Sequence, residues 1–204
     1  MIVIIDYKMA NLGSILNMLK RVGVPAVATA DPKLVERADK IILPGVGAFD
    51  NAMRNLHATN LVPLIEQKVL HQKVPVLGIC LGMQLLGKSS AEGHLPGLGW
   101  LDAHSVRFSF DQASPLKIPH MGWSEIQTQA ASPLMEDLGD HPRFYFVHSY
   151  HLVCNHAADV LATATYGQPF TAAVQRGNIM GVQFHPEKSH RFGLQLLTNF
   201  SHLP

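Results

Sequence analysis

The sequence has few cysteines, few charged residues and no long hydrophobic run. Two cysteines in 204 residues exclude a disulfide framework. Charged residues make up 15% of the chain and the formal net charge is +1, so there is no electrostatic basis for binding nucleic acid or a membrane surface. No apolar stretch reaches the roughly 20 residues of a membrane-spanning helix. We expect neither nucleic acid nor a membrane among the partners.

The amino-terminal segment Met1–Ile5 also lacks a basic leader and a cleavage site, and it runs directly into Asp6. Together with the absence of a disulfide framework, this predicts a cytoplasmic protein. The chain length and the 47% hydrophobic content suffice for one large core and are awkward for two. We therefore expect a single domain that spans residues 1–204.

The first half of the chain alternates strand-like and helix-like segments. The expected strands are apolar with little polar alternation, which is typical of strands buried on both faces; they cover residues 1–6, 24–29, 40–43 and 74–79. The expected helices cover residues 11–21, a segment that begins at Asp31 and Pro32, and residues 48 to about 72. This alternation predicts an α/β fold with a doubly wound, flavodoxin-like, mostly parallel sheet.

The second half of the chain contains strand-like segments with few helices between them. We expect strands over residues 100–108, 122–128, 143–147, 160–166, 171–175 and 179–184, and a closing helix over 191–200. Consecutive strands with short connections favour antiparallel pairs, so we expect these strands to extend the parallel sheet.

Cys80 lies where an apolar strand changes to a helical pattern, between Gly78 and Gly82. This Gly-x-Cys-x-Gly frame matches the geometry of a nucleophile elbow, in which glycines leave room for a tight strand-to-helix turn. A helix that starts at Leu81 would direct its positive end at the sulfur and favour the reactive thiolate. From the elbow alone, a buried structural cysteine is an equal alternative.

His185 ends a second apolar strand, in the segment GVQFHPEKS. Pro186 favours an extended His185, so Glu187 is expected to project the same way and to orient the imidazole. Cys80, His185 and Glu187 are therefore a candidate catalytic triad. The tripeptide alone is better explained as a surface turn, and the cysteine elbow is what favours the triad.

Acyl transfer also needs donors for the developing oxyanion. The backbone N–H of Leu81, directly after the nucleophile, is one candidate. The segment Pro44–Gly47 ends another strand, and its glycines permit close backbone approach, so Val46 and Gly47 are candidates for the second donor. A simple glycine turn is an equally good interpretation of this segment in isolation.

Three segments in this order resemble class I, triad-type glutamine amidotransferases: LPGVGAF at 43–49, GICLGMQLL at 78–86 and GVQFHPEKS at 181–189. Further segments resemble the glutaminase subunits of imidazole glycerol phosphate synthases: Asp6-Tyr7 with Asn11-Leu12, PHMGW at 119–123 and YFVHSY at 145–150. The resemblance covers essentially the whole chain. It implies the class I glutamine amidotransferase fold.

The resemblance implies that Cys80 attacks the glutamine side-chain amide, that His185 passes a proton to the leaving ammonia and that Glu187 orients His185. It also implies glutamine-binding positions, which are Gly47, Gln84, Glu92, Ser149 and Tyr150. It implies no cofactor and no metal.

The implied partner is a (β/α)8-barrel cyclase subunit, which uses the ammonia to make imidazole glycerol phosphate and aminoimidazole carboxamide ribotide in histidine biosynthesis. The resemblance places Asn11, Tyr145 and Lys188 at the interface with that barrel. Lys8, Ala10 and Ser124 depart from the family pattern and affect what is expected of local interface contacts.

Two alternatives stay open. One is a glutaminase subunit of another synthase, such as pyridoxal phosphate synthase, against which the PHMGW and YFVHSY segments argue. The other is a catalytically silent scaffold, against which the intact Cys80, His185 and Glu187 argue. His120, His148 and His151 have no acidic neighbours at ligand spacing, so we interpret them as packing or interface residues.

Overall fold

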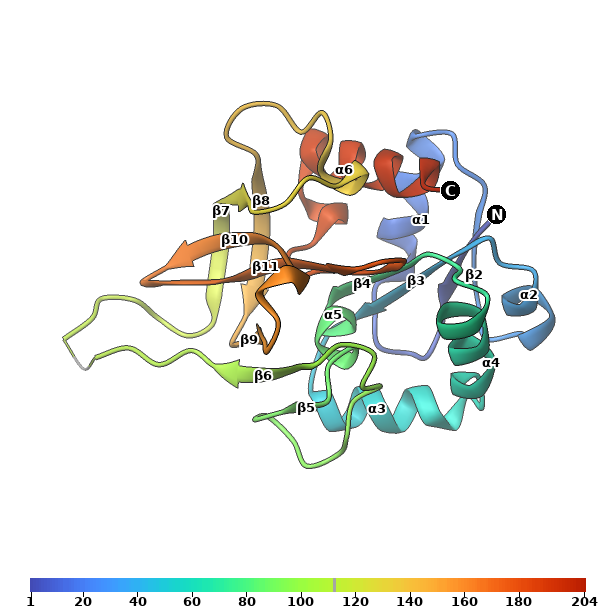
Figure 1. Ribbon diagram of the computed structural model, residues 1–204, viewed down its shortest axis with the longest axis horizontal. Helices are drawn as coiled ribbons and strands as arrows, with labels where there is room; N and C mark the ends of the chain where they lie inside the picture. Colours follow the sequence, from blue (N-terminus) through green and yellow to red (C-terminus); the bar gives the residue numbers. More distant parts are fainter. Residues whose placement is uncertain (112) are drawn as a thin grey trace.

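The computed structural model describes residues 1–111 and 113–204. Its main sheet has strands side by side in the order β2 (Ala26–Thr29), β1 (Ile2–Ile5), β3 (Lys40–Gly45), β4 (Val76–Cys80), β12 (Ile179–Val182), β11 (Gln168–Arg176), β10 (Val160–Tyr166), β7 (His120–Thr128) and β8 (Arg143–His148) (Figure 1). A small sheet contains β5 (Ser89–Ser90), β6 (Ala103–Arg107) and β9 (Tyr150–Cys154).

The main sheet has a parallel half and an antiparallel half. Strands β2, β1, β3, β4 and β12 pair in parallel, whereas β11, β10, β7 and β8 continue the sheet in antiparallel pairs. This confirms the expected parallel sheet with antiparallel additions. The exception to the expected order is β12, which comes late in the chain but pairs in parallel with β4.

Helices cover both faces of the parallel half (Figure 1). On one face lie α1 (Leu12–Arg21) and α6 (His190–His202). On the other lie α2 (Pro32–Glu36), α3 (Phe49–Ala58), α4 (Val62–Glu66) and α5 (Leu81–Leu85). In the part of the chain that the structure describes, no helix is long and apolar enough to cross a membrane.

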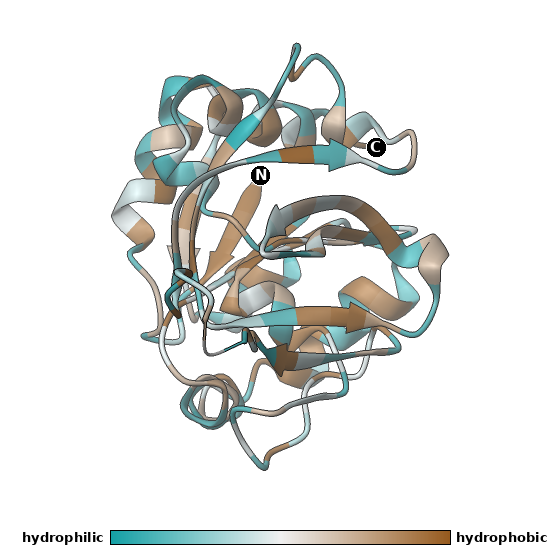
Figure 2. Cartoon of the chain, turned by 90° about the vertical axis from the view of Figure 1, so that its left-hand side faces the viewer, coloured by the Kyte–Doolittle hydropathy of each residue, from teal (hydrophilic) through white to brown (hydrophobic). Residues whose placement is uncertain are grey.

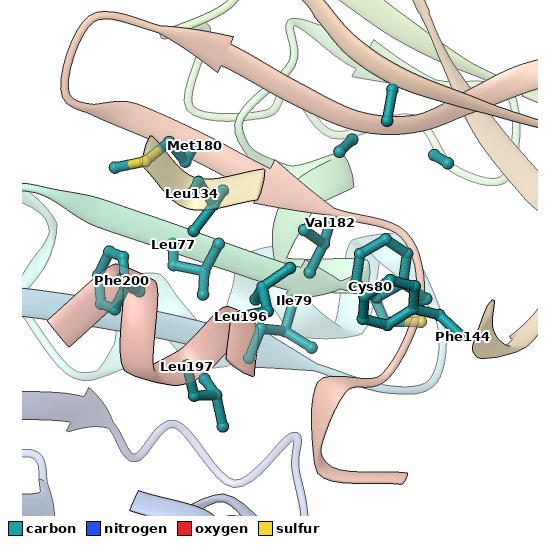
Figure 3. Packing of buried hydrophobic residues seen from close by; sticks show 14 of the residues in the cluster. Leu77, Ile79, Cys80, Leu134, Phe144, Met180, Val182, Leu196, Leu197 and Phe200 are labelled. Carbon is teal, nitrogen blue, oxygen red and sulfur yellow. The ribbon is translucent and has the colours of Figure 1, made fainter. Parts of the chain in front are cut away.

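Two hydrophobic cores, one on each face, explain why the parallel strands lack polar alternation. In β1, Ile2 and Ile4 belong to the core beneath α1 and α6, whereas Val3 and Ile5 belong to the core beneath α3 and α4. Figure 2 shows the central strands mostly in the hydrophobic colour, and Figure 3 shows the first core around β4 and α6. Strands buried on both faces need apolar residues at every position.

The helical segment expected from residue 48 to about 72 is confirmed, and it is divided into three elements. The chain forms α3, then α4, then a π-helical turn over Gln67–His71. Asn60 adopts a left-handed conformation with φ 59°, which ends α3, and Pro63 lies in the first turn of α4. The strand expected over 100–108 is also shorter, since β6 covers only Ala103–Arg107.

The sequence analysis missed β9 and the short β5. Only Ser149 separates the end of β8 from the start of β9, so the chain passes from the main sheet to the small sheet at this residue. The two ends of β9 are only half-buried, so its sequence resembles that of a connecting loop. This change of sheet matters for the site, because it brings Ser149 and Tyr150 to the carboxyl end of β4.

Candidate active site

Cys80 is the last residue of β4, and α5 begins at Leu81, so the strand-to-helix turn lies where the glycine frame predicts it. Cys80 has φ 55° and ψ −111°, a conformation that non-glycine residues rarely adopt. Such strain is characteristic of a nucleophile elbow. Figure 3 shows Cys80 at the end of the strand that carries Leu77 and Ile79.

The two framing glycines are required by close backbone packing. A Cβ atom on Gly82 would lie 1.8 Å from the carbonyl oxygen of Leu43 in β3, and one on Gly78 would lie 2.7 Å from the carbonyl oxygen of Gly82. The first turn of α5 therefore packs directly against the carboxyl ends of β3 and β4. This contact keeps Cys80 at the mouth of the crevice.

The pairing of β12 with β4 brings His185 to Cys80. Val182 lies opposite Ile79 in the parallel register, and the chain continues to His185 at the same end of the sheet. The segment Pro186–Lys188 then forms a 3₁₀ turn, η4, and not the extended continuation that we expected. The turn still brings the Glu187 Oε1 atom to 2.7 Å from His185 Nδ1.

The electrostatics of His185 suit proton transfer. Burial alone would lower the pKa of His185, but its contacts with Cys80 and Glu187 raise that pKa to about 10. Both contacts thus favour the protonated imidazole. Its Nε2 atom is buried and has no hydrogen-bond partner among the described residues, so it is free to act on a bound substrate.

A cavity of about 320 Å³ joins the predicted catalytic and substrate-binding residues. Its lining includes Val46, Gly47, Cys80, Leu81, Gln84, Glu92, Ser149, Tyr150 and His185. Every predicted glutamine-binding and oxyanion position thus borders one space. Glu187 lies behind His185, where it borders a second cavity.

The predicted oxyanion donor Val46 is engaged in this conformation. Its backbone N–H donates a hydrogen bond of 2.7 Å to the Met9 carbonyl oxygen. Gly47, the next residue, has φ 97°, a conformation that favours glycine. The Gly45–Val46 peptide, which carries this N–H, must therefore reorient before the Val46 N–H can face the cavity.

Glu92, predicted to bind glutamine, has a structural contact as well. Its Oε2 atom accepts a hydrogen bond of 2.9 Å from the backbone N–H of Phe49, the first residue of α3. Ala48, the cap residue of that helix, offers no side-chain acceptor. Glu92 therefore supplies the missing cap, and it does so from the wall of the cavity.

The three predicted interface residues lie together on one side of the site. The Lys188 ammonium is 5.7 Å from the centre of the Tyr145 ring, within the range of a cation–π contact. Lys188 and Asn11 both border the second cavity, of about 220 Å³. Asn11 also caps α1 by accepting a hydrogen bond from the Ser14 N–H.

The sequence analysis did not assign Gln183 or His148 to the site. Gln183 is fully buried, and its Nε2 atom lies 3.7 Å from Cys80 Sγ. His148 borders the cavity. The position of Gln183 two residues before His185 was a usable signal, because alternate residues of a strand point to the same side.

His120, His148 and His151 form a buried cluster around Phe108, as the packing interpretation expects. Burial lowers the pKa of all three, to about 4 for His120 and about 3 for His148. They are neutral at pH 7. Across residues 1–111 and 113–204, no three His, Cys, Asp or Glu side chains lie in positions that could hold a metal ion.

Comparison with known sequences identifies related proteins along the full chain. The family model "Glutamine amidotransferase class-I" matches residues 3–202. The chain is 50% identical to imidazole glycerol phosphate synthase subunit HisH 2 of Pseudomonas aeruginosa, with 100% of both chains covered. It is also 50% identical to the HisH 2 subunit of Methanococcus maripaludis, with 98% of each chain covered.

Comparison with solved structures identifies the same fold in more distant proteins. A putative GMP synthase subunit from Thermoplasma acidophilum superimposes with a TM-score of 0.71 at 18% identity, covering 98% of this chain and 91% of that one. A structure of PurLQS from Thermotoga maritima also gives 0.71 at 17% identity, covering 98% and 96%. These likenesses confirm the expected fold class.

The packing of Gly82 yields a prediction on stability. Gly82→Ala should lower the free energy of unfolding by at least about 1–3 kcal/mol, because its methyl group would overlap the Leu43 carbonyl oxygen. Gly13→Ala, at an exposed position of α1 where a Cβ atom would make only an ordinary contact of 3.7 Å with Asn11 Oδ1, should be neutral or stabilising. Urea unfolding of both variants tests this. Equal stability of the two would contradict the packing assignment.

The histidines predict a stability maximum near pH 6.5. His120, His148 and His151 stay neutral in the fold but take up protons in the unfolded chain below pH 6.5, so stability falls as pH drops towards 4. The raised pKa of His185 has the opposite effect on the pH dependence of stability. It stabilises the fold below pH 6.5, and this contribution is lost as pH rises towards 10.

Urea unfolding midpoints measured between pH 4.5 and 9.5 should therefore decline on both sides of pH 6.5. The lowered pKa values of carboxyl groups such as Asp50 and Asp102 act below this range. A midpoint that stays constant between pH 4.5 and 6.5 would refute the assignment of neutral buried histidines.

Proposed function

The chain belongs to the class I glutamine amidotransferase family, and we propose that it is the glutaminase subunit of an imidazole glycerol phosphate synthase. It hydrolyses glutamine to glutamate and ammonia, and the ammonia serves histidine biosynthesis. The observation that carries this proposal is the single cavity in which Cys80 faces His185, with Glu187 hydrogen-bonded behind the imidazole. The identities to HisH subunits support it.

In the first half of the reaction, Cys80 Sγ attacks the side-chain amide carbon of glutamine. A protonated His185 beside the sulfur stabilises negative charge on it and then gives its proton to the leaving nitrogen. The C–N bond breaks, ammonia leaves, and a glutamyl thioester remains on Cys80. The Leu81 N–H, at the start of α5, is one donor for the oxyanion of the tetrahedral intermediate.

In the second half, neutral His185 takes a proton from water, and the resulting hydroxide attacks the thioester carbon. The C–S bond breaks, glutamate leaves, and Cys80 and protonated His185 are restored. Glu187 holds Nδ1 throughout, which keeps Nε2 directed at the reacting atoms and stabilises the imidazolium. In this proposal Gly47, Gln84, Glu92, Ser149 and Tyr150 hold the glutamine.

The proposed partner is a (β/α)8-barrel cyclase subunit that binds near the cavity mouth. The exposed apolar side chains on this side support it: Met121 is 63% exposed, Trp123 45% and Val46 46%. Trp123 lies opposite Tyr145 in the β7–β8 pair, so it is next to the predicted interface residues. In this proposal, residues 1–204 act as one glutamine amidotransferase domain in the cytoplasm.

The hydrogen bond from Val46 to Met9 supports control of glutaminase activity by the partner. While this bond holds, the Val46 N–H does not serve the oxyanion, and free glutaminase turnover would waste glutamine. A ligand-bound partner that repositions Val46-Gly47 would supply the second donor. Loss of one oxyanion donor typically lowers kcat by about 10²–10³-fold.

The test of the function is glutamate release from glutamine, with and without the cyclase partner and its nucleotide substrate. The isolated chain should turn over slowly, and the loaded partner should accelerate it. Cys80→Ala should fold normally and reduce glutaminase activity about 10⁴-fold or more, while ammonia-dependent synthesis by the complex survives. A tenth of wild-type activity in Cys80→Ala, or full turnover by the isolated chain, would contradict the proposal.

Lys188 gives a separate prediction for the interface. Lys188→Ala should leave the triad intact but weaken assembly by about 2–5 kcal/mol, or release more glutamate than cyclised product. Lys33→Ala, on α2 at the opposite edge of the sheet, is the matched control and should match wild type in both measurements (Figure 1). If Lys188→Ala also matches wild type, Lys188 is a solvated surface lysine.

A further inference from the structure

A buried amide contacts the sulfur of Cys80 and has no role in the triad. Gln183 follows β12 in the sequence, two residues before His185, and it is fully buried. Its Nε2 atom lies 3.7 Å from Cys80 Sγ. Its Oε1 atom accepts a hydrogen bond of 3.0 Å from Gln84 Nε2. Gln183 thus links the nucleophile to the first turn of α5.

The direction of both amides is determined by a backbone carbonyl. Gln84 Nε2 is also 3.0 Å from the Tyr150 carbonyl oxygen, which can only accept. Gln84 must therefore present its NH₂ group on this side. Gln183 must then present its oxygen to Gln84, and this leaves the NH₂ group of Gln183 facing the sulfur.

The Tyr150 carbonyl is itself held by the buried His148, which a second buried histidine, His120, contacts in turn. His148 Nδ1 donates to it at 2.8 Å, so His148 Nε2 must accept from His120 Nδ1 at 3.2 Å. His120 Nε2, 3.0 Å from Ser124 Oγ, must in turn accept the serine hydroxyl hydrogen. Because burial keeps both rings neutral, each ring has one donor nitrogen and one acceptor nitrogen. All the hydrogen bonds from Ser124 to the Tyr150 carbonyl therefore donate in the same direction.

We propose that Gln183 is a further catalytic residue, which donates an N–H hydrogen bond to Cys80 Sγ and stabilises its thiolate, and that Gln84 and His148 are positioning residues that hold this amide in place. This inference rests on the proposed glutamine hydrolysis at the same site. The sulfur carries negative charge twice, as attacking thiolate and as the group that leaves the thioester. A hydrogen bond to the charged form favours both states.

The experiment measures the rate of Cys80 alkylation by iodoacetamide as a function of pH, with mass spectrometry to separate Cys80 from Cys154. The rate follows the thiolate fraction and requires neither glutamine nor the partner. The titratable groups near the sulfur stay in place in the Gln183 variants: Tyr7 behind the elbow, Glu92, His148, His185 and Lys188 around the cavity, and Glu187 behind His185.

Gln183→Glu preserves the acceptor for Gln84 but replaces the donor that faces the sulfur. We expect the pH midpoint of alkylation to rise by about one unit, which corresponds to about tenfold slower alkylation near neutral pH. Gln183→Leu removes the donor without adding a charge and should shift the midpoint in the same direction. Wild-type midpoints in both variants would overturn the proposal.

Gln175→Glu is the matched control on the neighbouring strand β11. Gln175 also accepts one hydrogen bond, from Ser132, and donates another, to the Gly177 carbonyl, so the same exchange loses one donor far from the sulfur. Its midpoint should equal that of wild type. An equal shift in Gln175→Glu would assign the effect to general charge and would also overturn the proposal.

The positioning role is tested with His148→Asn and His148→Leu. Asparagine can still donate to the Tyr150 carbonyl from the place of Nδ1, so its alkylation midpoint should stay near wild type, whereas leucine should raise it. Equal midpoints in these two variants would overturn the positioning role. If wild type fails to hydrolyse glutamine with its partner, the proposed function fails, and the alkylation profiles still decide the role of Gln183.

Discussion

The site depends on one contact, the parallel pairing of β4 with β12. Cys80 ends the first strand and His185 follows the second, and parallel neighbours bring their carboxyl ends to the same edge of the sheet. Cys80 and Gln183 are 103 positions apart in the chain, yet their side chains touch. Pairing in the opposite direction would send His185 to the far end of β4. The antiparallel strand β11 is what returns the chain so that β12 can run alongside β4.

The elbow combines a strained residue with tight packing that maintains the strain. A non-glycine residue at positive φ costs about 1–3 kcal/mol, so Cys80 keeps its conformation only because its surroundings enforce it. The close packing of Gly82 against Leu43 is one such constraint, since it brings α5 directly against β3. The same close approach places Leu81 in the wall of the cavity. The strained backbone of Cys80 thus lowers the stability of the fold, and it positions the sulfur at the cavity wall.

His185 separates two spaces with different chemistry. On one side is the larger cavity with Cys80. Buried amides and histidines next to it form hydrogen bonds whose donors and acceptors are fixed. On the other side is the smaller cavity with Asn11, Glu187 and Lys188, next to exposed side chains such as Trp123. The imidazole therefore stands between the glutamine site and the surface at which we propose that the partner binds. Contacts on both sides raise the pKa of His185: Cys80 borders the larger cavity and Glu187 borders the smaller one.

The sequence by itself determined the fold class, the elbow at Cys80 and the pairing of His185 with Glu187, because these follow from local features: apolar runs, framing glycines and residues two apart. Through family resemblance it also predicted the glutamine-binding positions, which the structure brings to one cavity. Only the tertiary structure decided which strands are neighbours, that Pro186–Lys188 is a 3₁₀ turn and that Val46 donates to Met9. Strand order and peptide orientation depend on contacts between distant segments, and the same apolar pattern is compatible with several orders. The amide of Gln183 belongs to this second group, since its direction depends on a carbonyl in β9, a strand that the sequence pattern did not reveal.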